Sequence, residues 1–200
     1  MPTVRRLLVA TTNRDKVREI RSLLEGAPVD LITLSEIAPV AEPEETGDTF
    51  EDNARLKARY YAKHSGMLTV AEDSGLVIDA LDGEPGVKSA RFLRPDASYP
   101  ERFAVIFERL ARHPERLRTA RFVCALSVVD GDAIAFETTG TVEGVIAETP
   151  AGARGFGYDP IFFYPPYRAT LAEVSDDDKL AVAHRGQAFR SLARWIRESR

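Results

Sequence analysis

The sequence predicts an α/β fold with a mixed β-sheet. In the first half of the chain, β-prone apolar runs alternate with segments whose apolar residues recur at helical spacing, which is typical of parallel strands joined by helices. In the second half, two β-prone runs flank Asp130-Gly131, a dipeptide typical of hairpin turns. The hairpin adds antiparallel strands to the parallel ones, so the sheet is expected to be mixed.

The first half is expected to begin with a strand, a helix, a strand and a loop. Residues 4–11 and 29–34 are apolar and β-prone and predict strands, whereas residues 15–25 place apolar side chains on one helix face. Residues 38–47 are rich in Pro and Glu and predict a loop. The first strand should therefore lead directly into the first helix.

A second helix and a divided β-segment follow. Thr49, with an acid three residues later, resembles a capping box and predicts a helix that continues to about residue 64. Within residues 68–80, two apolar runs flank Glu72 and Asp73. We expect the first run to be a strand that ends at these acids, with residues 74–75 turning the chain back toward the core.

The second half is expected to contain two helices and three strands. Apolar residues on one helical face predict helices at residues 100–111 and 185–198. The hairpin arms should be strands at about 120–129 and at 133–142, and residues 161–164 form a short β-like run. Because no repeat or flexible linker interrupts the chain, all 200 residues are expected to form one domain.

Composition indicates a soluble globular protein and narrows its partners. The chain is 44% hydrophobic and 29% charged, with a formal net charge of −4. This acidic balance offers no general attraction to a polyanion, so no stable nucleic-acid partner is expected. No run approaches the roughly 20 apolar residues of a membrane span, so we expect a cytoplasmic protein without a membrane partner. The single cysteine, Cys124, excludes an intramolecular disulfide, and its apolar surroundings predict a buried thiol.

A first polar motif lies at the junction of the first strand and helix, Thr11-Thr12-Asn13-Arg14-Asp15-Lys16. Free backbone amides at a helix start favour a phosphate group, and hydroxyl, amide and ammonium groups add donors. The motif lacks the glycine pattern of a P-loop. A Thr or Asn helix cap beside a solvated lysine is the structural alternative.

Two acidic clusters, Glu44-Glu45 and Glu72-Asp73, have the chemistry of a magnesium site. Mg²⁺ is commonly held by one or two carboxylates together with substrate phosphates and water. The alternative is a solvated acidic loop for the first cluster and a turn for the second. Asp73 favours the functional interpretation because an acid next to an apolar strand is expected at a strand end, where active-site groups are often displayed.

Two further motifs have the chemistry of nucleotide-base recognition. In Gly155-Phe156-Gly157-Tyr158-Asp159-Pro160, glycines leave room for a flat ligand beside an aromatic ring, and Asp159 accepts hydrogen bonds. Lys179 and His184-Arg185 precede the last helix and offer donors. A structural turn and a plain helix start are the respective alternatives.

Five motifs in order resemble one family. They are Thr-x-Asn-x-x-Lys at 11–16, Glu-Glu-Thr-Gly at 44–47, Glu-Asp-Ser-Gly-Leu at 72–76, Gly-Phe-Gly-Tyr-Asp-Pro at 155–160 and His-Arg-Gly-Gln at 184–187. Together they resemble the inosine triphosphate pyrophosphatase, or Ham1-like, family. The resemblance implies an elongated α/β fold whose central mixed β-sheet is flanked by helices, with two lobes around a substrate cleft, and a homodimer. It also implies Mg²⁺-dependent hydrolysis of ITP, dITP and XTP to the monophosphate and pyrophosphate, which cleanses the nucleotide pool.

The resemblance also implies residue roles. Glu44 and Asp73 would be metal ligands, and Asp73 would be the general base. Phosphate contacts would come from Thr11, Thr12, Asn13, Arg14, Asp15 and Lys16. Further substrate contacts would come from Ser74, Phe156, Gly157, Tyr158, Asp159, Lys179, His184 and Arg185. Donors such as His184 and Arg185 would match the six-position carbonyl of hypoxanthine and xanthine and reject adenine.

Two departures from the family pattern and three rival functions remain open at this point. Thr12 stands where many members have Gly, and Ala183 where many have Ser. One rival is a Maf-like pyrophosphatase acting on other nucleotides, and a second is a regulatory module that binds nucleotide without turnover. A single-strand nucleic-acid binder is disfavoured because no extended basic stripe interleaves with aromatic residues.

Overall fold

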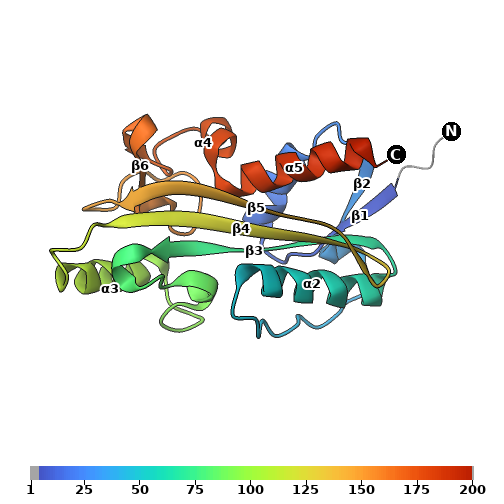
Figure 1. Cartoon of the computed structure of the whole chain (residues 1–200), viewed down its shortest axis with the longest axis horizontal. Helices are drawn as coiled ribbons and strands as arrows, with labels where there is room; N and C mark the ends of the chain where they lie inside the picture. Colours follow the sequence, from blue (N-terminus) through green and yellow to red (C-terminus); the bar gives the residue numbers. More distant parts are fainter. Residues whose placement is uncertain (1–4, 200) are drawn as a thin grey trace. The chain divides into compact units, whose positions relative to one another are not determined.

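A computed structural model describes residues 5–199 as a seven-stranded sheet flanked by helices (Figure 1). The strands are β1 (Arg5–Val9), β2 (Val29–Thr33), β3 (Leu68–Ile78), β4 (Thr119–Asp130), β5 (Ala133–Ile146), β6 (Phe162–Tyr164) and β7 (Ala169–Thr170). The α-helices are α1 (Arg14–Leu23), α2 (Phe50–Ser65), α3 (Tyr99–Ala111), α4 (Asp176–Val182) and α5 (His184–Glu198). Short 3₁₀ helices are η1 (Leu34–Glu36), η2 (Asp79–Leu81), η3 (Gly86–Arg91), η4 (Asp159–Ile161) and η5 (Pro165–Tyr167).

The sheet is mixed, as predicted. Its strand order is β2-β1-β3-β4-β5-β6-β7. Strand β1 pairs in parallel with β2 and β3, whereas β6 pairs antiparallel with β5 and β7. The α/β class and the mixed sheet are therefore confirmed.

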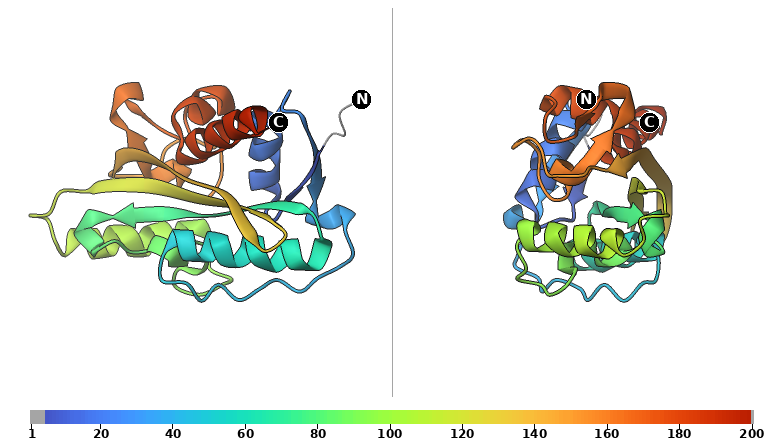
Figure 2. Two further views of the ribbon diagram at one scale, coloured as in Figure 1. Left: turned by 45° about the vertical axis from the view of Figure 1, so that its right-hand side comes forward. Right: turned by 90° about the vertical axis from the view of Figure 1, so that its left-hand side faces the viewer.

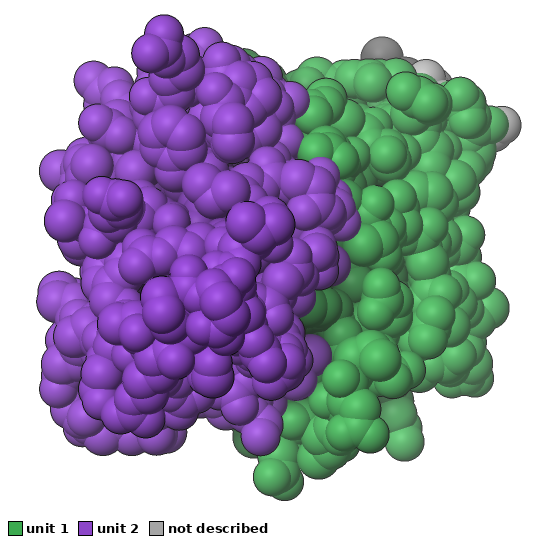
Figure 3. All heavy atoms as spheres, turned by 60° about the vertical axis from the view of Figure 1, so that its left-hand side comes forward, with its two compact units in different colours: residues 1–73, 124–140, 184–200 green, residues 74–123, 141–183 purple. Residues whose placement is uncertain are grey.

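The described chain divides into two compact units, which Figure 3 colours separately. Unit 1 contains residues 5–73, 124–140 and 184–199, and unit 2 contains residues 74–123 and 141–183. Strands β3, β4 and β5 each contribute one part to each unit. The expectation of two lobes around a substrate cleft stays a prediction.

Unit 1 has helices on both faces of its strands. Side chains alternate along β1, so Leu7 packs in a core with α1 and α5, whereas Leu8 packs in a core with α2. Figure 1 and the left view of Figure 2 show α2 and α5 on opposite sides of the sheet. The register pairs Val9 with Val70. This pairing brings the loop after β1 beside the part of β3 that follows Val70, where the two acids lie.

Unit 2 has its own apolar core. Residues Leu76 and Ile78 of β3, Ile106 of α3 and Phe162 of β6 are fully buried there. Tyr158 belongs to the same core and donates its hydroxyl to the carbonyl oxygen of Ser89 at 2.9 Å. The glycine-rich segment before Tyr158 is therefore anchored by a buried aromatic residue.

Most of the predicted elements are confirmed, with small changes in their ends. Strands β4 and β5 flank Gly131, whose φ of 59° suits the hairpin turn. The Thr49 hydroxyl accepts the backbone N–H of Asp52 at 3.1 Å and caps α2. Helix α4 was not predicted from the sequence, because its seven residues are too few to show a clear helical periodicity of apolar side chains. Val4, the first residue of the first predicted strand, lies outside the described residues.

The predicted turn after Asp73 is wrong. Strand β3 is continuous over eleven residues and carries Glu72 and Asp73 in its interior. Adjacent strand residues point to opposite faces, and each carboxylate meets cations on its own face, so the strand need not end there.

Within residues 5–199, no helix is long and apolar enough to cross a membrane.

Candidate active site

Two adjacent carboxylates of β3 lie at the centres of two separate side-chain clusters in unit 1. The exposed fraction is 3% for Glu72 and 6% for Asp73. Glu72 faces the side covered by α1 and α5, and Asp73 faces the side covered by α2. Buried carboxylates need charged partners, and each of these two has its own set.

The Glu72 cluster is a network of charges that balance one another. Arg185 donates through Nε to Glu72 at 2.7 Å and through Nη1 to Glu19 at 2.7 Å. Lys16 Nζ lies 3.4 Å from the second oxygen of Glu72, and Cys124 Sγ lies 3.4 Å from the same oxygen. Burial by itself would raise the pKa of Glu72, but Arg185 and then Lys16 outweigh it and hold that pKa well below its usual value. Glu72 is therefore a fixed anion.

In the Asp73 cluster, two carboxylates contact the same ammonium group. Lys57 donates to Asp73 Oδ1 at 3.1 Å and to Glu45 Oε1 at 2.6 Å, and Asn53 donates to Asp73 Oδ2 at 3.2 Å. Burial raises the pKa of Asp73, Lys57 opposes this, and Glu45 adds to it, with a net increase. Burial lowers the pKa of Lys57, but Asp73 and Glu45 outweigh it and raise that pKa. Asp73 is therefore a carboxylate of increased proton affinity beside an ammonium group.

The loop between β1 and α1 contains the helix cap that its sequence allows. The Asn13 side chain caps α1 by accepting the backbone N–H groups of Asp15 at 2.9 Å and Lys16 at 3.2 Å. Thr12 and Arg14 are exposed, and the Lys16 ammonium points to Glu72. The Lys16 ammonium group therefore lies beside an acid of β3. The phosphate contacts of this loop stay a prediction.

The predicted base-recognition residues are divided between the units. In unit 2, Lys179 Nζ donates to Asp159 Oδ2 at 2.6 Å and lies 4.6 Å from the centre of the Phe156 ring. Asp159 Oδ2 also accepts the backbone N–H of Phe156 at 2.8 Å. A Cβ atom on Gly155, whose φ is 68°, would lie 2.2 Å from Asp159 Oδ2, so only glycine fits this approach.

The five other predicted contact residues differ in their surroundings. Tyr158 is 4% exposed and lies in the unit 2 core, so the expected slot for a flat ligand remains beside Phe156 alone. Arg185, in unit 1, is 2% exposed and its guanidinium holds Glu72 and Glu19. His184 is buried at the start of α5, and Ser74 and Gly157 are partly exposed.

Sequence reasoning missed Glu19, Asn53 and Lys57. A signal exists for the last two: they lie four residues apart on α2, within the stripe that also buries Ala54, Ala58 and other small or apolar residues. A polar residue within a buried helical stripe needs a partner, which marks it as a candidate for a site. Glu19 has a similar signal, because it lies four residues before Leu23, which packs against the core that contains Ile20.

The Asp73 cluster can hold a cation. Within residues 5–199, no three His, Cys, Asp or Glu side chains are arranged as a closed metal site. Mg²⁺ does not need one, because one or two carboxylates with phosphate oxygens and water suffice. Asp73 and Glu45 both bind the Lys57 ammonium, which shows that they can share a positive charge. Glu44, the predicted ligand, is exposed, and its role is untested.

Comparison with known proteins gives a full-length match. A profile of the Ham1 family matches residues 7–195. A dITP/XTP pyrophosphatase of Exiguobacterium sp. is 44% identical over 187 residues, with 94% of each chain covered. The solved HAM1 protein of Coxiella burnetii superposes with a TM-score of 0.91 at 38% identity, over 97% of this chain and 99% of that one. For the Staphylococcus aureus Ham1 protein the TM-score is 0.88 at 34% identity, over 98% and 100%. The ordered motifs, the mixed sheet and these matches agree, and the chain belongs to the Ham1 family.

Proposed function

We propose that this protein hydrolyses the triphosphates of deaminated purines, ITP, dITP and XTP, to the monophosphate and pyrophosphate with Mg²⁺. The observation that carries the proposal is the Asp73 cluster, a buried carboxylate of raised pKa bonded to Lys57 and Asn53. Family membership supports the reaction class, since the Exiguobacterium relative is a dITP/XTP pyrophosphatase. A homodimer and a cytoplasmic location stay predictions.

In this proposal, Asp73 accepts a proton from the water that attacks the α-phosphorus. Burial raises the pKa of Asp73, which makes its carboxylate a better base than an exposed aspartate. Lys57 balances the charge beside the carboxylate, and Asn53 fixes its second oxygen. Lys16, in the first turn of α1, supplies positive charge for the phosphate oxygens. Mg²⁺, when bound, withdraws charge from the phosphates.

We propose Asp73 and one glutamate of the Glu44-Glu45 pair as the metal ligands. The resemblance of the sequence motif favours Glu44, whereas the contacts favour Glu45, because Glu45 lies on the same Lys57 ammonium as Asp73. Displacement of that ammonium by a divalent cation would leave both carboxylates facing the cation. Glu45 is therefore the second ligand that the contacts support best.

We propose that unit 2 contributes base recognition through Phe156, Asp159 and Lys179. The Lys179–Asp159 pair offers a donor and an acceptor next to an aromatic face, which suits a flat base with a carbonyl at its six-position. An adenine amine in that position would leave the donor without a partner. Arg185 has the supporting role of holding Glu72 and Glu19, and His184, beside it, is the remaining candidate donor.

Phosphorus NMR of the products from ITP, GTP and ATP with Mg²⁺ tests the proposal. The expected result is IMP and pyrophosphate from ITP, with slow turnover of GTP and ATP. Release of orthophosphate would place the attack on another phosphorus. Nucleotide binding without any product would make the protein a regulatory module, and faster turnover of modified pyrimidine triphosphates would favour a Maf-like activity.

A further inference from the structure

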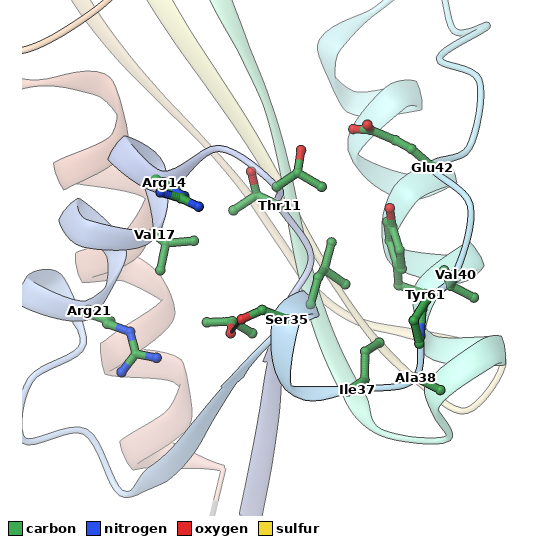
Figure 4. A pocket seen from close by; sticks show the side chains of 14 residues that line it. Thr11, Arg14, Val17, Arg21, Ser35, Ile37, Ala38, Val40, Glu42 and Tyr61 are labelled. Carbon is green, nitrogen blue, oxygen red and sulfur yellow. Dashed lines mark hydrogen bonds between the residues drawn. The ribbon is translucent and has the colours of Figure 1, made fainter.

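A pocket in unit 1 lies beyond the Asp73 cluster. Its volume is about 560 Å³, which is within the range of small-molecule sites. It lies where β1 and β2 end, between α1, the segment that follows β2, and Tyr61 of α2 (Figure 4). The carboxyl ends of parallel strands are a common place for ligands in α/β sheets. Asp73, Lys57 and Glu45 are not among its lining residues.

One wall of this pocket is cationic. Arg14, Val17 and Arg21 are three and four residues apart, so they share one face of α1 and line the same side of the pocket (Figure 4). The Arg14 side chain forms no ion pair with any residue that the structure describes. Arg21 contacts Glu36 at 3.6 Å, and both side chains are about half exposed, with 55% and 46% of their surface accessible. Such a contact holds the guanidinium only weakly.

Glu36 does not depend on Arg21. Its carboxylate accepts the backbone N–H of Thr33 at 2.9 Å and the Thr33 hydroxyl at 2.6 Å. The Thr33 hydroxyl lowers the pKa of Glu36 most, so the carboxylate is stable without the arginine. Arg21 can therefore exchange Glu36 for a ligand anion without leaving Glu36 unpaired.

The opposite wall is apolar with one acid. Ile37, Val40 and the ring of Tyr61 face the α1 wall across the pocket, and Glu42 lies next to Tyr61 (Figure 4). Burial and the neighbouring Glu42 raise the pKa of the Tyr61 hydroxyl, which is thus a neutral donor. An apolar surface between cations on one side and an acid on the other suits a ligand with an anionic end, a flat body and a hydroxyl or amino group.

We propose that this pocket binds a nucleoside monophosphate at a site separate from the Asp73 cluster. The phosphate lies between Arg14 and Arg21, the base lies against Val40 and Tyr61, and Glu42 accepts from a sugar hydroxyl or an exocyclic amine. Thr11 and Thr12 line the pocket and also belong to the predicted phosphate loop. An occupied pocket therefore contacts the loop that the proposed substrate uses.

The test measures AMP binding by calorimetry in the presence of a saturating α,β-methylene analogue of ITP and Mg²⁺. AMP is the probe because it is neither the proposed substrate nor its product. Arg21→Gln removes a pocket cation, and Val40→Asp places a charge on the apolar wall. Arg18→Gln is the matched control, since Arg18 is similarly exposed, pairs with Asp15 at 3.3 Å and does not line the pocket.

The proposal predicts AMP binding that persists with the analogue present. Arg21→Gln should weaken it roughly tenfold or more, because a charge-assisted bond to phosphate is lost. Val40→Asp should also abolish or strongly weaken it, whereas Arg18→Gln should change it less than about twofold. Circular dichroism establishes that each variant is folded, and ITP turnover should survive in Arg21→Gln. The proposal is overturned if wild type does not bind AMP, if the analogue displaces AMP, or if Arg21→Gln and Arg18→Gln behave alike.

Discussion

The surroundings of Glu72 and Asp73 differ although the two residues are neighbours in one strand. Glu72 contacts Arg185 and Lys16, and Arg185 also contacts Glu19. Asp73 and Glu45 both contact the ammonium group of Lys57, so a second carboxylate lies close to Asp73. The pKa of Glu72 is accordingly lowered and that of Asp73 raised.

In the proposed function, this difference separates a structural carboxylate, Glu72, from a reactive one, Asp73. A buried anion with enough cations is inert, because neither a proton nor a metal ion improves its surroundings. A buried anion beside a second carboxylate, as Asp73 is beside Glu45, has increased affinity for both. The alternation of β3 places one acid of each kind on each face, and the predictions below test this contrast from the largest effect to the smallest.

Asp73→Asn should reduce ITP turnover by about 10²–10⁴-fold, because general-base catalysis is lost. The fold should persist, since Asn keeps the shape and relieves the cluster of one negative charge. Steady-state kinetics and thermal unfolding without metal are the measurements. Turnover close to that of wild type in a folded variant would remove Asp73 from its assigned role.

Glu72→Gln should lower the free energy of unfolding by about 3–5 kcal/mol, because Arg185 loses one of its two buried anions. Urea unfolding of this variant and of Asp73→Asn measures the contrast directly. Since the pKa of Glu72 is depressed in the folded protein, its stabilisation is present above the unfolded-state pKa near 4.5 and is lost as pH falls below it. The decrease in unfolding free energy caused by Glu72→Gln should therefore become smaller as the pH is lowered. A decrease that does not change with pH would contradict the depressed pKa of Glu72.

Glu45→Gln should raise the Mg²⁺ concentration that gives half-maximal activity by roughly 10–100-fold. A loss of this size is typical when a residue that positions a metal ion or one of its ligands is removed. Glu44→Gln, one residue away and exposed, is the matched variant. Titration of activity with Mg²⁺ compares them. If only Glu44→Gln has the effect, the resemblance identifies the ligand correctly, and the contact of Glu45 with Lys57 is structural.

Lys57→Met should raise the pKa of Asp73 further in the metal-free protein, because Lys57 is the group that most opposes the effect of burial. Carbon-13 NMR of the Asp73 carboxyl group follows its titration. The shift should be upward, so that the carboxylate protonates at higher pH than in wild type. A fall in the pKa, or no change, would mean that Lys57 does not control the proton affinity of Asp73.

Local sequence patterns determined much of the fold and the composition of the site. The order of the main strands and helices, the Asp130-Gly131 hairpin and the Thr49 cap follow from periodicity and turn chemistry, which act over a few residues. Five ordered motifs were sufficient to indicate the family, because each keeps its functional residue types close together in the chain.

Tertiary structure alone decided which of these residues meet. Glu19 and Arg185 are 166 residues apart in the chain, and Lys57 and Asp73 are 16 apart, so no local pattern pairs them. The uninterrupted course of β3 likewise depends on cations supplied by α1, α2 and α5. The choice between Glu44 and Glu45 has the same origin, because it depends on where the loop before α2 lies against Lys57. Charge balance around a buried group is a sum over distant segments, and it exists only once the chain has folded.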